Sequence, residues 1–381
     1  MKKKFMSFRT LQEISCFILL ILLLAACRKS RGEDPVPPAF TSGQGFYLLN
    51  EGNMGRNNAT LDYAALDSGK YYRNIYGGVN PTVPKELGDV GNDIAIYGSK
   101  LYAVISCSNK IEVMDAKTAK RIGQIEIPNC RNIIFYNGFG YVTSYAGPVQ
   151  QNPDFQQVGY VAKIDTGSLQ VLNKCLVGQQ PDGLAIANHK IYVANSGGYL
   201  YPNYENTVSV IDLTSFKETQ RIKVDINLYR VCADKQDNVW VTSNGDYSEN
   251  SSKLFCIDSK TDQVTDSINI VVSNFWLDEN KLYIIGVAWN YETSSSTVSY
   301  GVVDVVSKQV VSRKFISDGT EGNIITPYGI AVHPITKDIY VSDAKDYISP
   351  GVLYCFSKEG KQKWNERTGV NPAHFAFYRK K

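Results

Sequence analysis

The side chains that could do chemistry in this sequence are mainly carboxylates, amides, arginines and phenols. Only three of the 381 residues are histidines, whereas 25 are tyrosines. So few histidines leave little room for a multi-histidine metal site or a histidine base, and we find no Ser-His-Asp triad in the pattern. So many tyrosines indicate β-strands, together with a surface that binds by stacking and by hydroxyl hydrogen bonds. The net charge of +3 is too balanced for a nucleic-acid binder driven by phosphate electrostatics.

The elements that position these side chains repeat along the chain. An aromatic strand returns seven times, at a spacing of roughly 40 to 55 residues that is typical of propellers. Its copies are residues 46–49, 101–104, 140–143, 191–194, 239–242, 282–285 and 339–342. A further strand precedes each copy, and two follow it. The second of these begins after a turn that several units open with an aspartate, as at Asp115 and Asp212, and we interpret these aspartates as turn caps.

The first and last repeats indicate how the fold closes. The first repeat begins at Gly45 with the aromatic strand and lacks the strand that should precede it, whereas residues 372–378 match that missing strand. The C-terminal strand is therefore expected to complete the first blade, which leaves no open sheet edge. The sequence predicts an all-β fold over residues 45–378: a seven-bladed β-propeller of four-stranded antiparallel blades.

The long connections of this propeller are expected on one face, which we call the loop face. Residues 50–60, 144–158, 195–206, 243–252, 289–297 and 343–350 form these loops, while the opposite turn face carries tight turns. His189 and His333 fall in such turns and are expected to be solvated. Loops of this kind usually carry the binding site.

Candidate ligand-binding residues come from these loops and from the first positions of the innermost strands around the channel. They are Glu51, Asn92, Arg131, Tyr145, Asp182, Tyr201, Arg230, Asn244, Trp289, Tyr328, Lys345 and His374. Other interpretations stay open. A loop tyrosine can be surface decoration, Arg131 and Arg230 can be structural ion-pair partners, and His374 can be a hydrogen-bonded core histidine. Aromatic and amide surfaces suit a large polar ligand, a carbohydrate or another protein.

The N-terminus has the pattern of a lipoprotein signal. Basic residues precede an apolar run over 14–26, which is too short to span a membrane. The run ends in Leu24-Ala25-Ala26-Cys27, a lipobox in which Cys27 would carry the lipid. We expect residues 1–26 to be a signal peptide and residues 27–44 a lipidated, flexible tether.

The cysteines and carboxylates leave two questions open. Six cysteines follow Cys27, and most fall in strands as expected for buried thiols. Cys107 and Cys130 both lie toward the loop face, where a disulfide between them is an alternative in an oxidising compartment. Calcium is the metal alternative, because calcium-dependent propeller hydrolases place Glu, Asn and Asp ligands around the channel. The matching residue types here are Glu51, Asn92, Asn195 and Asp343.

Three segments carry a family resemblance. Residues 45–53, GFYLLNEGN, resemble the start of YncE-like propeller lipoproteins. Residues 85–93, KELGDVGND, and residues 128–131, PNCR, resemble the surface-exposed cobalamin-binding propeller lipoproteins of outer-membrane corrinoid uptake.

The resemblance implies a protein anchored through Cys27 on the outer membrane and exposed at the cell surface. It would capture cobalamin and related corrinoids and pass them to a TonB-dependent transporter. Cobalamin would be a ligand, no covalent cofactor would be required, and no catalysis or nucleic-acid partner is expected. A carbohydrate- or protein-binding propeller is the first alternative, and a metal-dependent hydrolase or lyase is the second.

Overall fold

The computed structural model describes residues 45–83, 86–149, 151–152, 154, 156–290 and 295–378. The expected signal peptide, the tether and the lipidation site Cys27 lie outside these ranges. None of the helices in the described ranges is long and apolar enough to cross a bilayer.

The described chain forms seven four-stranded antiparallel sheets, as the repeats predict. Blade 1 contains β28 (Pro372–Tyr378), β1 (Gly45–Asn50), β2 (Thr60–Ala65) and β3 (Lys70–Tyr72). Blade 2 contains β4 (Gly91–Tyr97), β5 (Lys100–Ile105), β6 (Lys110–Asp115) and β7 (Arg121–Glu126). Blade 3 contains β8 (Cys130–Tyr136), β9 (Phe139–Ser144), β10 (Tyr160–Asp165) and β11 (Val171–Leu176).

The remaining four blades repeat this order. Blade 4 contains β12 (Pro181–Ala187), β13 (Lys190–Asn195), β14 (Thr207–Asp212) and β15 (Lys217–Lys223). Blade 5 contains β16 (Leu228–Ala233), β17 (Asn238–Ser243), β18 (Lys253–Asp258) and β19 (Gln263–Ile268). Blade 6 contains β20 (Asn274–Asp278), β21 (Lys281–Asn290), β22 (Ser295–Asp304) and β23 (Gln309–Ser312). Blade 7 contains β24 (Pro327–Val332), β25 (Ile339–Asp343), β26 (Pro350–Phe356) and β27 (Gln362–Val370).

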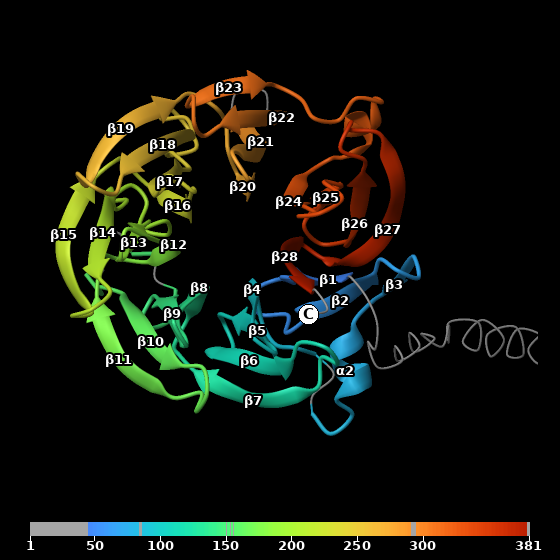
Figure 1. Ribbon diagram of the computed structural model, residues 1–381, viewed down its shortest axis with the longest axis horizontal. Helices are drawn as coiled ribbons and strands as arrows, with labels where there is room; N and C mark the ends of the chain where they lie inside the picture. Colours follow the sequence, from blue (N-terminus) through green and yellow to red (C-terminus); the bar gives the residue numbers. More distant parts are fainter. Residues whose placement is uncertain are drawn as a thin grey trace, which may run out of the picture. The chain divides into compact units, whose positions relative to one another are not determined.

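The ring closes through the C-terminal strand. β28 pairs antiparallel with β1, with Phe375 opposite Leu48, so residues from both ends of the propeller share one blade. The innermost strands β4, β8, β12, β16, β20, β24 and β28 surround the centre, and each contacts the innermost strand of the next blade (Figure 1). The prediction of a seven-bladed propeller closed in this way is confirmed.

The core lies between adjacent blades. The aromatic residues of the second strands are buried there in six of the seven blades, because alternate side chains of a strand point into the neighbouring blade. Tyr47, Tyr102, Tyr141, Tyr192, Trp240 and Tyr340 are each at most 2% exposed. Burying one such side chain stabilises the fold by roughly 1.5–3 kcal/mol. These aromatics are therefore structural.

The turns behave as their sequences indicate. Asp115 caps the turn before β7, since its carboxylate accepts hydrogen bonds from the backbone N–H groups of Lys117 and Thr118. Asp212 does the same before β15 through the N–H of Ser215. The prediction of turn caps is confirmed at both positions.

Three local features differ from expectation or add to it. Residues 289–290 and 295–297 belong to strands instead of a loop, because β21 and β22 pair as far as Asn290 opposite Ser295. His333 is buried, not solvated, and its Nδ1 accepts the backbone N–H groups of Ile335 and Thr336. Two short helices, α2 (Ile75–Val79) and the 3-10 helix η1 (Thr320–Asn323), interrupt the strands.

Candidate functional site

A cavity of about 240 Å³ lies among the innermost strands of all seven blades. Its polar lining residues are near the loop-face ends of those strands, while apolar residues follow further along. The polar residues are Asp93, Asn132, Arg230, Asn274 and His374. The large apolar residues are Ile134, Leu184, Phe275, Trp276, Ile330 and Phe375. The cavity therefore changes from polar to apolar with depth.

Backbone irregularities shape the polar end. In six of the seven described blades, the pairing between the innermost strand and its neighbour slips within the first residues of the innermost strand. Such β-bulges re-aim side chains and occur often beside functional sites. In β8 the slip spans Cys130 to Ile133 and includes Arg131, and in β16 it spans Leu228 to Val231 and includes Tyr229 and Arg230.

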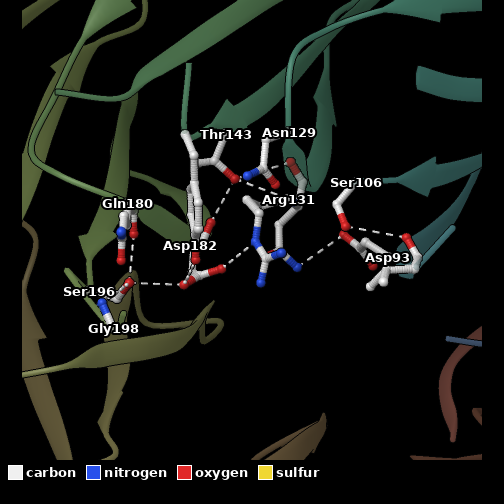
Figure 2. Close-up of polar contacts among 12 residues, drawn as sticks. Asp93, Ser106, Asn129, Arg131, Thr143, Gln180, Asp182, Ser196 and Gly198 are labelled. Carbon is white, nitrogen blue, oxygen red and sulfur yellow. Dashed lines mark hydrogen bonds and ion pairs between the residues drawn. The ribbon is translucent and has the colours of Figure 1, made fainter. Parts of the chain in front are cut away.

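Arg131 belongs to a buried cluster between blades 3 and 4, shown in part in Figure 2. Its Nε donates to Asp182 Oδ1 at 2.9 Å, and both side chains are at most 9% exposed. Tyr145 OH donates to Asp182 Oδ2 at 2.8 Å, and Ser196 Oγ lies 3.0 Å from the same oxygen. The guanidinium carbon also lies 4.6 Å from the centre of the Tyr145 ring. Arg131 thus has an acceptor, a counter-charge and an aromatic neighbour inside the protein.

The backbone around this cluster is fixed by further hydrogen bonds. Thr143 Oγ1 donates to the backbone carbonyl of Asp182 at 2.7 Å, which joins β9 to β12. Ser196 Oγ lies 2.6 Å from the carbonyl of Gln180, and the N–H of Gly198 donates to Ser196 Oγ (Figure 2). The loop after β13 is thereby anchored to the start of β12.

A second, partly buried cluster joins blades 1 and 7. Tyr328 OH donates to Glu51 Oε2 at 2.6 Å, and His374 Nε2 lies 2.9 Å from Glu51 Oε1. Burial by itself would raise the pKa of the Glu51 carboxyl. The hydrogen bonds from His374 and Tyr328 outweigh burial and hold that pKa below its ordinary value. Glu51 is therefore an ionised acceptor at neutral pH.

Four phenols surround these clusters. Burial, the largest cause, raises the pKa of Tyr145, Tyr199 and Tyr328, and it raises that of Tyr229 to about 12. All four are consequently neutral at physiological pH and can donate a hydrogen bond. The rings of Tyr145 and Tyr199 meet edge to face, with centroids 6.4 Å apart.

Arg230 differs from Arg131. Its guanidinium carbon lies 4.5 Å from the centre of the Tyr229 ring. Its Nε is buried without a hydrogen-bond partner, and within the described ranges no carboxylate lies at ion-pair distance from it. A buried donor without an acceptor is unfavourable, so Arg230 is the unusual group of the cavity.

Exposed large apolar side chains, here called the exposed rim, lie in the loop-face connections of blades 1, 4, 5, 6 and 7. It comprises Met54, Tyr201, Tyr247, Trp289, Ile325, Tyr347 and Ile348, all at least 45% exposed. On the described part of the turn face only Val306 and Ile335 are large, apolar and exposed. Exposed apolar side chains gathered on one face favour an interaction site there, which makes the loop face the candidate.

The structure brings together most of the candidates that the sequence predicts. Glu51, Arg131, Tyr145, Asp182, Arg230, Tyr328 and His374 lie at the loop-face end of the channel, in or beside the two clusters. Asn92 is buried at the start of β4. Tyr201 and Trp289 belong to the exposed rim, whereas Asn244 and Lys345 lie half-buried in the loops.

Sequence reasoning missed Tyr229, Ser196, Asp93 and Asn132 and did not select Tyr199. Tyr229, Asn132 and Asp93 lie beside or within the register slips, which the hydrophobic pattern does not mark. Ser196 and Tyr199 follow directly after β13. Their position after a second strand, matching that of Glu51 after β1, could have found them.

The structure shows the surroundings of the residues proposed for a calcium site and for a disulfide. Among the described residues no three or more His, Cys, Asp or Glu side chains are grouped to hold a metal ion. Asp343 accepts the backbone N–H groups of Thr326 and Lys345. Asn195 donates to Thr207 and Ser209 within blade 4. Cys107 and Cys130 are free thiols, and so are the other four described cysteines.

Solved structures with a similar fold are distant in sequence. Hydrazine synthase of Kuenenia stuttgartiensis has a TM-score of 0.57 at 15% identity, over 74% of this chain and 88% of that one. A quinonprotein alcohol dehydrogenase-like protein of Bacteroides thetaiotaomicron has a TM-score of 0.56 at 16% identity, over 88% and 78%. The Pan2 WD40 domain of Neurospora crassa has a TM-score of 0.52 at 10% identity, over 74% and 80%. At these identities the similarity shows the fold alone.

The sequence comparisons are more specific to this chain. No curated protein matches it. The family model of DUF5074, a domain of unknown function, matches residues 44–368, which is most of the propeller. The chain therefore belongs to the DUF5074 family, and its family domain is a seven-bladed β-propeller.

Proposed function

We propose that the protein is a cell-surface binding propeller that captures cobalamin and related corrinoids on its loop face. The observation that carries this proposal is the pairing of the exposed rim with the polar, partly unsatisfied mouth of the channel. Apolar and aromatic side chains suit the body of a broad ring, while arginine, amides and neutral phenols suit carboxamides around its edge. The sequence resemblance to corrinoid-binding propeller lipoproteins points to the same ligand.

The anchor and the transport partner extend this proposal. Cys27 and its lipobox would hold the protein on the outer membrane, and a TonB-dependent transporter would receive the corrinoid. Both rest on the sequence pattern and the resemblance, since residues 1–44 lie outside the described ranges. No covalent cofactor or catalytic step is needed, because capture and handover use only noncovalent contacts.

The decisive test is titration of the full chain, purified in detergent, with cyanocobalamin, adenosylcobalamin and cobinamide. Calorimetry should give saturable binding with one corrinoid per chain. Tryptophan emission should fall, because the corrin absorbs near-ultraviolet light close to Trp289 on the rim. Trp289→Phe should remove more of that quenching than Trp364→Phe, a matched change on the outer strand β27. Absence of heat and of quenching with all three corrinoids would rule out the proposal.

A protein partner is the second candidate, and a specific observation favours it. Met54, Ile325 and Ile348 are exposed aliphatic side chains of the rim, and such residues suit a protein surface better than a carbohydrate. Capture of a defined outer-membrane protein by the full chain, lost on Ile348→Ser and independent of corrinoid, would support this candidate. Binding on a glycan array, without corrinoid binding, would instead favour a carbohydrate ligand.

A further inference from the structure

The central cavity is too small for the whole ligand that the loop face would hold. Its volume of about 240 Å³ lies below the range of roughly 300–1,000 Å³ that is usual for pockets enclosing a drug-sized molecule. It opens among the innermost strands, directly below the channel mouth. Its size suits one side arm of a larger ligand, or a small molecule of a few non-hydrogen atoms.

Every described polar residue that lines the cavity, except one, has a hydrogen-bond or ion-pair partner for its side chain. Asp93 accepts the backbone N–H of Ile133 at 2.9 Å. Asn274 donates to the carbonyl of Tyr328 and accepts the N–H of Phe275. His374 is bound to Glu51. Arg230 alone, among the described polar residues of the lining, has neither an ion-pair partner nor a hydrogen-bond acceptor for its buried Nε.

The charges around Arg230 decide what kind of acceptor fits. Asp93 and Glu51 are the carboxylates whose fields act on Arg230, and Arg131 is neutralised by Asp182. Two carboxylates near one arginine leave no net positive charge to attract an anion, while the guanidinium itself repels a cation. A neutral group that carries its own oxygen acceptor therefore fits best, and a carboxamide is the simplest such group.

The change from polar to apolar lining with depth indicates what the remainder of a bound group should be. Beyond the polar end, Phe275, Trp276 and Phe375 line the cavity with aromatic surface, against which methylene groups would be buried favourably. We propose that the channel is a subsite for a short carboxamide-bearing arm, whose carbonyl accepts a hydrogen bond from Arg230. This rests on the proposed function in so far as the arm belongs to the captured corrinoid.

The first experiment tests the subsite without a corrinoid. Saturation-transfer NMR would compare propionamide, propionate and propylamine on the full chain, on Arg230→Met and on Arg221→Met, an exposed arginine of β15 paired with Glu218. Propionamide should give the strongest signal with the wild type and with Arg221→Met, and lose most of it with Arg230→Met. A stronger signal from propionate or propylamine, or equal signals in all three chains, would overturn the subsite.

The second experiment joins the subsite to the proposed function. Arg230→Met should bind cyanocobalamin at least tenfold more weakly than the wild type, and Arg221→Met should bind it equally well. Without ligand, Arg230→Met should melt within about 4 °C of the wild type, because no ion pair is broken and only the contact with the Tyr229 ring is lost. A corrinoid affinity unchanged by Arg230→Met would overturn the arm while leaving capture intact. Absence of corrinoid binding by the wild type, with the propionamide pattern preserved, would refute capture and leave the subsite.

Discussion

Arg131 and Arg230 occupy comparable places in two blades and have different surroundings. Each lies in the register slip of an innermost strand, and each guanidinium packs on a tyrosine ring at about 4.5 Å. The next blade supplies Asp182 to Arg131, whereas the blade after Arg230 supplies Asn274, whose amide is engaged with the backbone. The neighbour across the blade boundary, and not the position in the strand, separates a structural arginine from one open to a ligand.

The same substitution at both arginines tests this comparison most directly. Arg131→Met leaves Asp182 buried without its cation and should lower the free energy of unfolding by about 3–5 kcal/mol. Arg230→Met breaks no ion pair within the described ranges and loses the contact with the Tyr229 ring, so it should lower the free energy of unfolding by no more than about 1 kcal/mol. Urea denaturation of both variants measures the difference. Equal losses would show that the two arginines have the same role.

A double substitution separates the ion pair from the packing around it. Asp182→Leu should be strongly destabilising, because Arg131 is then buried without a counter-charge. Adding Arg131→Met should recover a large part of that loss, since an apolar pair of similar size needs no counter-charge. Denaturation of the two single variants and the double variant gives the coupling energy. If the loss in the double variant equalled the sum of the two single losses, Arg131 and Asp182 would not be energetically coupled, and the prediction would be wrong.

Most of the fold could be predicted from the sequence, because its signals are local and repeated. The seven aromatic strands follow a period of two, and the aspartate turns follow them at fixed offsets. Closure followed from residues 372–378, which have the pattern of the missing strand. The extension of β21 and β22 over residues 289–290 and 295–297 could not be predicted, since Ser295, Ser296 and Thr297 also suit a loop. The prediction that His333 is solvated was wrong, because its buried Nδ1 accepts the backbone N–H groups of its own turn.

The sequence predicted many of the residues of the site, but it did not predict how they contact one another. Counting to the start of each innermost strand found Arg131, Asp182 and Tyr328. The register slip in β16 places Tyr229 beside Arg230 in the unpaired stretch, and it leaves no trace in the alternation of apolar residues. Which arginine meets a carboxylate depends on contacts between residues 51 positions apart, such as Arg131 and Asp182, and a single sequence does not specify such contacts.

Glu51 offers a test of the second cluster through pH. Glu51→Gln keeps a carbonyl acceptor for Tyr328 but removes the charge, and should lower the free energy of unfolding at pH 7 by about 1.5–3 kcal/mol. The pKa of Glu51 is lower in the folded state, so its contribution is complete above the ordinary value of 4.5. It is lost as the pH falls through the folded pKa.

The expected result is a gap between wild type and Glu51→Gln that narrows below about pH 4.5. Urea denaturation from pH 7 to pH 3 would measure it, with Glu249→Gln in an exposed loop as the matched control. The control should show no gap at any pH. A gap for Glu51→Gln that stays constant down to pH 3 would contradict the ionised acceptor.

The exposed rim should give the smallest effect on stability and a separate effect on binding. Tyr201 and Trp289 are about half exposed or more, so Tyr201→Ser and Trp289→Ser should each change the free energy of unfolding by less than about 0.5 kcal/mol. Each lost ring contact should still weaken corrinoid binding by up to about tenfold. Ile335→Ser on the turn face, exposed to a similar degree, is the control and should change neither quantity. Calorimetry and thermal melts measure both, and equal corrinoid affinity in all three variants would remove the rim from the binding surface, leaving the channel mouth to account for capture by itself.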